Sequence, residues 1–299
     1  MATTEATQAL PGQIERMGQR RTLWSDAWRR LRRNRAALAG LFAGILLILI
    51  AIFADVLAPY PYAEQHITKV FQPIGTPEFP LGTDQLGRDL LSRLIYGARI
   101  SLGVALLAQV IILLIGVPIG LIAGAGSHRV DNLLMRFTDI MYAFPDLLFV
   151  IIILSVLGRN ILFVPIAIAI VNWTGLARLV RGQVLSLKEK EFIEAARTVG
   201  DTQGQIIRRH LLPNALTPII VAVTLGVPQF ILLESVLSFI GIGAPPPIPS
   251  WGLMINDGFN SIFSYPHIVI LPGIAIALTM LSYTFLGDGL RDALDPRDQ

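Results

Sequence analysis

The sequence predicts an all-α membrane protein with six transmembrane helices and both termini in the cytoplasm. Of its 299 residues, 53% are hydrophobic and only 15% are charged, whereas about 25% of a soluble domain is charged. Residues 36–54, 100–127 and 258–287 contain no Asp, Glu, Lys or Arg. Each of these stretches reaches the roughly 18 residues that indicate a membrane-spanning helix. They are continuously apolar, which excludes the alternating pattern of a transmembrane barrel.

The expected spans cover residues 36–57, 100–124, 137–157, 161–178, 213–241 and 266–287. The fourth span is the least regular, because Asn172, Trp173 and Thr174 interrupt it and Arg178 ends it early. A distortion is expected in the third span at Pro145. The proline-rich segment 244–249 cannot continue a helix, so a loop is expected between the fifth and sixth spans.

The distribution of Lys and Arg predicts the orientation, because cytoplasmic connections carry an excess of these residues. The N-terminal arm, residues 1–35, contains eight arginines, and the connection after the fourth span contains seven Lys and Arg. In total, nineteen Lys and Arg lie on this side of the predicted membrane and five on the other. Both termini are therefore expected in the cytoplasm. Residues 24–33 are compatible with an amphipathic helix at the membrane surface or with a charged anchor for the first span.

Several kinds of chemistry are absent from the sequence. It contains no cysteine, which excludes disulfides and thiolate metal sites. None of its three lysines follows a glycine, so the chain has no P-loop. The four histidines lack metal-ligand spacing, and neither HExxH nor GxSxG is present. We therefore predict no catalytic residue, metal or cofactor in this chain, and no nucleic-acid partner.

The connection between the fourth and fifth spans, about 186–212, is expected to form two short helices. The first runs from about 188 to 199, and Gly200 follows it as a residue able to adopt positive φ. Asp201 or Thr202 then caps a second helix that ends at Pro213.

The first short helix has a surface that favours docking. Ala195 and Ala196 allow close approach of a partner, and Glu194 and Arg197 lie about one turn apart. Such a helix suits a groove on a cytoplasmic protein. The alternative is an amphipathic loop that is merely solvated.

Glu234 is the only charged residue between positions 211 and 256. A charge in the membrane is costly, so this residue is expected to face the bundle interior or a wet cavity. It either lines the translocation pathway, or switches between inward and outward states, or fixes helix packing through hydrogen bonds. Gly116 and Gly120 form a small-residue face for close helix packing, for which a partner permease is one candidate neighbour.

Three segments resemble known transporter motifs. Glu194-Ala195-Ala196, then Gly200, then His210-Leu211-Leu212-Pro213 resembles the EAA loop of binding-protein-dependent ABC importer permeases. The usual Ile at the first closing position is His210 here, which is similar to the peptide/nickel branch. Segments 81–102 and 286–296 resemble the C-type subunit of dipeptide and oligopeptide permeases.

This resemblance covers nearly everything after residue 20 and implies a domain organisation. The N-terminal arm is 1–35, and 36–98 holds the first transmembrane helix and an external loop. Residues 99–290 form a five-helix permease core that contains the coupling loop, and 291–299 form a cytoplasmic tail. The implied fold is that of a type I ABC importer in a bacterial or archaeal cell membrane.

The resemblance also implies partners and a mechanism. The chain would pair with a B-type permease and two ATPase subunits that hold ATP and Mg²⁺, and an external binding protein would deliver di- or oligopeptides. Alternating access would be driven through Glu194, Ala195, Ala196 and Gly200, without ATP hydrolysis by this chain. Nickel, glutathione or opines are alternative cargo. A stand-alone secondary carrier is an alternative of another class, for which inverted repeats would be expected, and a membrane-embedded enzyme is a third.

Overall fold

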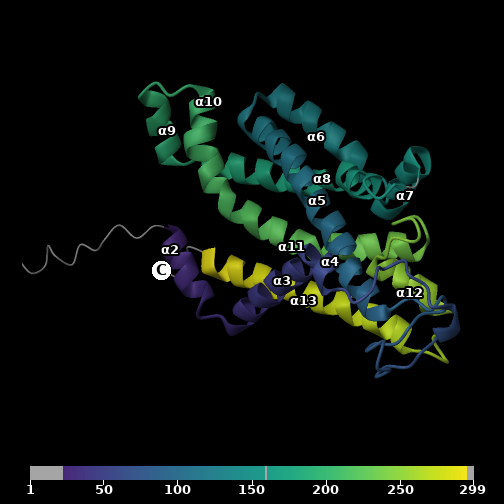
Figure 1. Ribbon diagram of the computed structural model, residues 1–299. Coiled ribbons are helices and arrows are strands. Elements are labelled where there is room, and N and C mark those ends of the chain that lie inside the picture. The colour runs from purple at the N-terminus through teal and green to yellow at the C-terminus, as the bar shows by residue number, and fades with distance from the viewer. Residues whose placement is uncertain (1–22, 159, 295–299) are drawn as a thin grey trace, which may run out of the picture.

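The computed structural model describes residues 23–158 and 160–294, which form helices joined by loops with two isolated β-bridges (Figure 1). The parts of the predicted arm and tail at 1–22 and 295–299 lie outside the described residues. The helices are α2 (Leu23–Leu31), α3 (Arg35–Ile52), α4 (Ala54–Leu57), α5 (Leu90–Ala125), α6 (His128–Tyr142), α7 (Asp146–Leu157), α8 (Phe163–Lys188), α9 (Glu191–Thr198), α10 (Gln203–Ile206), α11 (Leu212–Phe239), α12 (Trp251–Phe259) and α13 (His267–Leu294). The structure also contains a 3₁₀ turn, η1 (Ile67–Lys69), and a π-helical turn, η2 (Ile207–Leu211).

Within residues 23–158 and 160–294, five helices are long and apolar enough to cross a membrane: α3, α5, α8, α13 and the continuous helix 203–239. The α6–α7 pair qualifies only as a broken span, bent by 86°. The predicted single span 137–157 is therefore wrong, whereas the distortion expected at Pro145 is confirmed. The 12 residues of α7 extend about 18 Å, too short to cross about 30 Å of hydrocarbon alone.

The packing of α5 against α8 shows that α6 and α7 together carry the chain back across the bundle. Gly116 of α5 faces Trp173, Gly120 faces Ala177 and Gly124 faces Val184. The contacts advance along both helices together, so α5 and α8 are parallel. Because α5 ends where α6 begins, the α6–α7 pair returns the chain to the opposite end before α8. Counted as one broken span, this pair brings the candidate membrane spans of the described chain to six.

The glycine face of α5 packs within this chain. A Cβ at Gly120 would lie 2.6 Å from Ala177 O and from Val180 Cβ, which is closer than real Cβ contacts. The expectation that this face meets a partner permease is therefore wrong. Its small residues instead let the α5 and α8 backbones approach closely.

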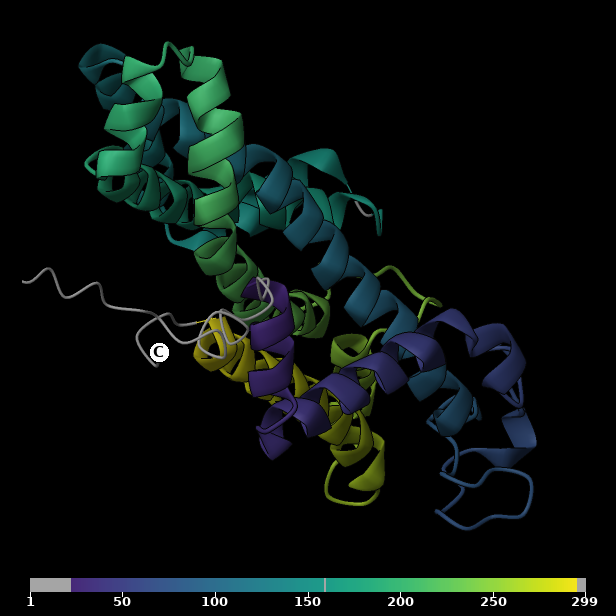
Figure 2. The same cartoon turned by 90° about the vertical axis from the view of Figure 1, so that its left-hand side faces the viewer.

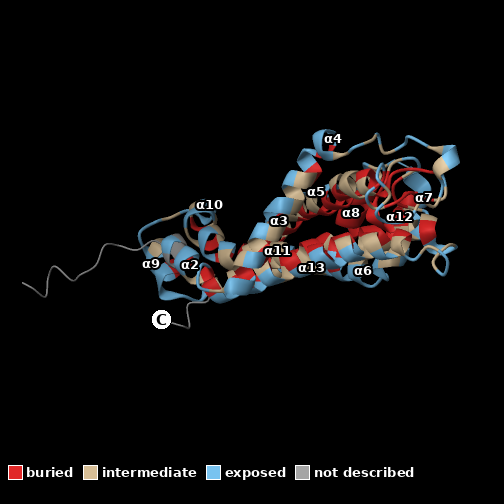
Figure 3. Ribbon diagram, turned by 60° about the horizontal axis from the view of Figure 1, so that its bottom comes forward, coloured by how far each residue is buried: buried red, intermediate tan, exposed pale blue. Residues whose placement is uncertain are grey.

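Helix α3 runs antiparallel to α13, so the two ends of the described chain lie together. Gly40 faces Ser282, and Gly289 faces Ala37. Helix α2 buries Leu31 at this junction. Figure 3 shows α2 and α9–α10 at one end of the molecule, with α12 at the other. The amphipathic segment 24–33 is thus helical in its described part and docked on the end of α13.

Helix α8 continues to Lys188, beyond Arg178, at which the sequence predicts that the fourth span ends. Arg178 donates to Asp139 of α6 at 2.8 Å, and Arg181 donates to Asp131 of α6 at 2.5 Å. These carboxylates neutralise both arginines. The helix therefore continues through two charges that in isolation would end a membrane span.

The fifth span is also longer than predicted, because the second short helix does not end at Pro213. Proline lacks an N–H and its ring clashes with the carbonyl four residues earlier. The chain widens into a π-turn, in which Leu212 N–H donates to Ile207 O. Asn214 Nδ2 donates to His210 O at 2.6 Å. The helix therefore passes through Pro213 into α11.

Helix α5 begins at Leu90, well before the predicted start near residue 100. Asp89 caps it by accepting a hydrogen bond from Ser92 N–H at 2.7 Å. In the second turn, Arg93 is buried and donates to Asp257 of α12 at 2.9 Å. Arg88 donates to the same carboxylate at 2.9 Å. These pairs join the loop 59–89 to α12, a helix the sequence analysis did not predict.

Candidate functional site

Helix α9 presents the coupling residues predicted from the sequence at one end of the molecule, next to α10, as the green helices of Figure 2 show. Glu194 and Ala195 are exposed and Ala196 is half-buried. Ile193 is fully buried in the main core. The helix is thus anchored by one apolar side chain while the Glu-Ala pair faces outward.

The turn after α9 requires glycine for its conformation. Gly200 has φ +97°, and its N–H donates to Arg197 O at 3.0 Å. Asp201 N–H donates to Ala196 O at 3.0 Å, which completes the Schellman pattern of helix ends. The predicted positive φ is confirmed. A Cβ at Gly200 would meet nothing within 4 Å, so the backbone angle alone favours glycine here.

Two polar side chains that the sequence analysis missed tie this unit to the end of α5. Lys188 Nζ donates to Gly124 O at 2.9 Å, and Gln203 Nε2 donates to Ala125 O at 2.8 Å. Their place just before α9 and at the start of α10 is a weak sequence signal, since any polar residue there would suit a solvated loop. Hydrogen bonds thus join the chain on either side of α9 to the end of α5, and α10 continues through η2 into α11.

Polar side chains also order the chain around α10. Thr202 forms a capping box with Gln205, as the predicted cap required. His210 Nε2 lies 3.2 Å from Asp201 Oδ2, so this histidine contacts the turn that begins α10. Arg208 and Arg209 of η2 line an open groove of about 370 Å³ beside α10. The outward surface of this unit is therefore rich in cations.

Glu234 lies at the junction of three helices. Its side chain is fully buried and accepts hydrogen bonds from Ser101 Oγ of α5 at 2.9 Å and Ser238 Oγ at 2.6 Å. Ser101 Oγ in turn accepts from Trp251 N–H of α12 at 3.2 Å. The carboxyl group thus links α5, α11 and α12 through serine hydroxyls.

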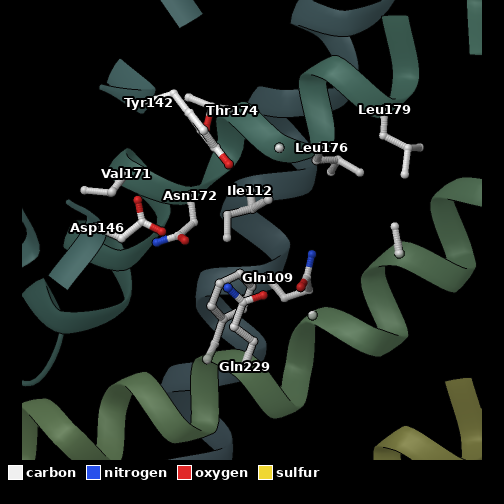
Figure 4. A pocket seen from close by; sticks show the side chains of 14 residues that line it. Gln109, Ile112, Tyr142, Asp146, Val171, Asn172, Thr174, Leu176, Leu179 and Gln229 are labelled. Atoms are coloured by element: carbon white, nitrogen blue, oxygen red, sulfur yellow. The ribbon is translucent and has the colours of Figure 1, made fainter. Parts of the chain in front are cut away.

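A second feature was not predicted from the sequence: a cavity of about 320 Å³ among the membrane-spanning helices. Gln109, Asn172 and Gln229 project into it from α5, α8 and α11 (Figure 4). The signal in the sequence was an amide side chain within the apolar stretch of each of three spans. Glu234 is not among the cavity-lining residues.

Among the residues that the structure describes, no three His, Asp or Glu side chains are grouped so that they could hold a metal ion.

Comparisons with known proteins agree with this architecture. Residues 116–297 match the family model for the binding-protein-dependent transport system inner membrane component. Residues 22–73 match the N-terminal TM domain of oligopeptide transport permease C. A chain of the inward-facing MetNI methionine ABC transporter has a similar fold, with a TM-score of 0.53 and 19% identity, and the match covers 69% of this chain and 98% of that one.

Individual relatives are similar over almost the whole length. The oligopeptide transport system permease protein OppC of Bacillus subtilis is 40% identical over 98% of this chain and 96% of its own. The dipeptide transport system permease protein DppC of Alkalihalophilus pseudofirmus is 45% identical, over 92% and 90%. The glutathione transport system permease protein GsiD of Pectobacterium atrosepticum is 40% identical, over 93% and 92%. The chain therefore belongs to the family of binding-protein-dependent transport system inner membrane components, as a permease of the OppC/DppC type.

Proposed function

We propose that this chain is one permease subunit of an ATP-driven importer of dipeptides or oligopeptides, with the type I importer fold. The supporting observation is its identity of 40–45% to oligopeptide and dipeptide permeases along nearly the whole chain. A glutathione permease is similar to the same degree. Glutathione is therefore the specific alternative cargo, ahead of nickel and opines.

In this proposal, α9 docks into a groove on a cytoplasmic ATPase subunit. The exposed Glu194 and the small Ala195 and Ala196 form the contact, and Gly200 sets the angle between α9 and α10. Buried Ile193 holds α9 in place. Because α10, η2 and α11 are continuous, closing of the ATPase subunits would tilt α11 directly and open the pathway in alternation.

The positions of the other subunits follow from placing α9 on the cytoplasmic side of the membrane. The end with α9 and α2 lies in the cytoplasm, where two ATPase subunits bind ATP and Mg²⁺, and this chain hydrolyses none. The end with α12 and the loop 59–89 faces a substrate-binding protein outside the inner membrane. A B-type permease supplies the other half of the pathway. Glu234 keeps α5, α11 and α12 together as the helices move, or switches their packing between inward and outward states.

The test of this function is ATP-dependent uptake by the complete complex in proteoliposomes. A labelled dipeptide, a labelled oligopeptide and labelled glutathione are offered with their binding proteins. We expect peptide uptake that requires ATP. Uptake without ATP would instead support a stand-alone carrier. Uptake of glutathione but of neither peptide would identify glutathione as the cargo.

The coupling role is tested in the same vesicles with two variants, Gly200→Val and Glu194→Lys. A β-branched residue is strained at positive φ, and the reversed charge opposes docking. Both variants should assemble with the partner permease but lose binding-protein-stimulated ATP hydrolysis. Gly204→Val is the matched control, because Gly204 is also without neighbours within 4 Å yet has no positive φ. Full stimulation in both variants would exclude the coupling role.

A further inference from the structure

We propose that Gln109, Asn172 and Gln229 form a binding site for the backbone of a peptide in transit through the membrane. This inference rests on the proposed function and names the residues that would contact the cargo inside the permease. The cavity that they line has a volume of about 320 Å³, at the lower end of the roughly 300–1,000 Å³ that ligand pockets occupy. The site would be completed by the partner permease.

The three amide side chains lie within membrane-spanning helices, where burying a polar group costs free energy. Each is well inside a helix that crosses the membrane: α5, α8 or α11. Without water, a polar side chain at this depth needs a partner or a wet cavity. Their convergence on one cavity from three helices (Figure 4) indicates that they face a polar occupant rather than lipid.

Gln109 provides a second, independent observation. Its side chain is only 5% exposed, and among the described residues no group hydrogen-bonds its Oε1. A buried polar atom without a partner costs roughly 1–3 kcal/mol. The space for this side chain exists because residue 226 is glycine, since a Cβ there would lie 2.4 Å from Gln109 Oε1. The chain thus retains an unsatisfied amide at the wall of the cavity.

The chemistry of the lining matches a peptide backbone. Asn172 Nδ2 donates to Ile168 O at 2.9 Å, so its Oδ1 is the atom that accepts from an occupant. Gln229 supplies a carbonyl acceptor and an NH₂ donor, whereas Gln109 supplies its NH₂ donor because its Oε1 lies against Gly226. These groups pair with the N–H and C=O of a peptide bond. Asp146 is the only charged residue among those that line the cavity. A nearly neutral, amide-lined wall would bind the backbone without selecting its side chains.

The first test compares Gln109→Met and Gln229→Met with the wild-type complex at saturating peptide-loaded binding protein. Methionine keeps length and apolar contact but cannot hydrogen-bond. Peptide uptake should fall on the order of fivefold in each methionine variant, because this is the factor that one neutral hydrogen bond contributes. The decrease should be equal for trialanine and trileucine. Stimulated ATP hydrolysis should stay at the wild-type level. Leu176→Met, an apolar change in the same cavity, is the control and should have no effect.

The second test uses thiol labelling, because this chain has no cysteine. Gln229→Cys and Leu232→Cys are both exposed positions on α11, but only residue 229 lines the cavity. With accessible cysteines removed from the other subunits, trialanine should slow labelling of Gln229→Cys by a water-soluble maleimide. It should not slow labelling of Leu232→Cys.

The outcomes separate this inference from the proposed function. If the wild-type complex imports no peptide, the proposed function fails and this site fails with it. If the wild type imports peptide while both methionine variants match it, only this site is excluded. If the variants lose ATP hydrolysis and uptake in parallel, the amides act in packing or coupling rather than in binding.

Discussion

Asp257 and the buried Asp84 together balance two buried arginines at the end of the molecule that carries α12, so loss of Asp257 leaves one positive charge uncompensated. Arg88 and Arg93 both donate to Asp257 at 2.9 Å, and their side chains are 6% and 1% exposed. Breaking a buried pair costs about 3–5 kcal/mol, because a charge is left uncompensated. Asp257→Ala should therefore lower the free energy of unfolding by this order, measured as a lower melting temperature of the purified complex.

Asp55 offers the matched control for this prediction. It pairs with Arg99 at 2.9 Å, but its side chain is 68% exposed. The hydrogen bond from Arg99 lowers the pKa of Asp55 from its ordinary value, but water screens this exposed pair. Asp55→Ala should leave the melting temperature unchanged. Equal melting shifts for Asp257→Ala and Asp55→Ala would contradict a role for burial.

Glu234 allows packing and charge to be separated by two substitutions. Glu234→Gln keeps the shape and can still bond to Ser101 and Ser238, since a hydroxyl both donates and accepts. It should assemble in normal yield. Glu234→Leu removes the acceptor of both hydroxyls and should destabilise the complex by roughly 1–3 kcal/mol, measured by thermal unfolding. Normal stability but lost uptake in Glu234→Gln would instead assign the residue to the transport switch.

At the scale of elements, the contact of α5 with α8 depends on glycines. A Cβ at Gly120 would overlap the α8 backbone, whereas one at Gly103, on the same helix, would meet nothing within 4 Å. Overpacking of this kind costs about 1–3 kcal/mol. Gly120→Leu should lower the melting temperature of the complex, and Gly103→Leu should not. The prediction fails if the two variants melt alike.

The helices themselves could be predicted from apolar runs, but several of their ends could not. Asn34, Asp89 and Thr202 cap helices through local hydrogen bonds, which follow short sequence rules. By contrast, Arg178 lies within α8 rather than at its end, and it pairs with Asp139 of α6. Such neutralisation depends on a tertiary contact that periodicity does not contain.

In the candidate site, too, local features could be predicted from the sequence, whereas features that depend on helix packing could not. The positive φ at Gly200 followed from a local helix-end motif and is found in the structure. The amide cavity was not predicted, because Gln109 and Gln229 lie far apart in the sequence and meet only when α5 packs against α11. Glu234 was singled out by its isolation among apolar residues, and Ser238 lies one turn further along the same helix. Its other partner, Ser101, lies on α5, whose packing against α11 the sequence does not specify.

For the whole molecule, the parallel packing of α5 and α8 decides the number of crossings. The first and last described residues of the chain lie on the side of the molecule that carries α9. This agrees with six crossings rather than five. The loop 59–89 and α12 lie together at the other end, joined by Arg88 and Asp257. With six crossings, the membrane would lie between these two ends, and from the positive-inside rule we propose that the α9 end faces the cytoplasm.

This topology is tested by single cysteines at three exposed positions in the cysteine-free chain: Gln65, Val199 and Ser264. With an impermeant thiol reagent, Gln65→Cys and Ser264→Cys should react in intact cells. Val199→Cys, whose parent residue is 88% exposed, should react only after permeabilisation. Reversed accessibility would invert the orientation and exclude docking of α9 on cytoplasmic ATPases. Labelling of Gln65→Cys and Ser264→Cys from opposite sides would mean that the bent α6–α7 pair does not cross, because four crossings separate these positions only if that pair is one of them.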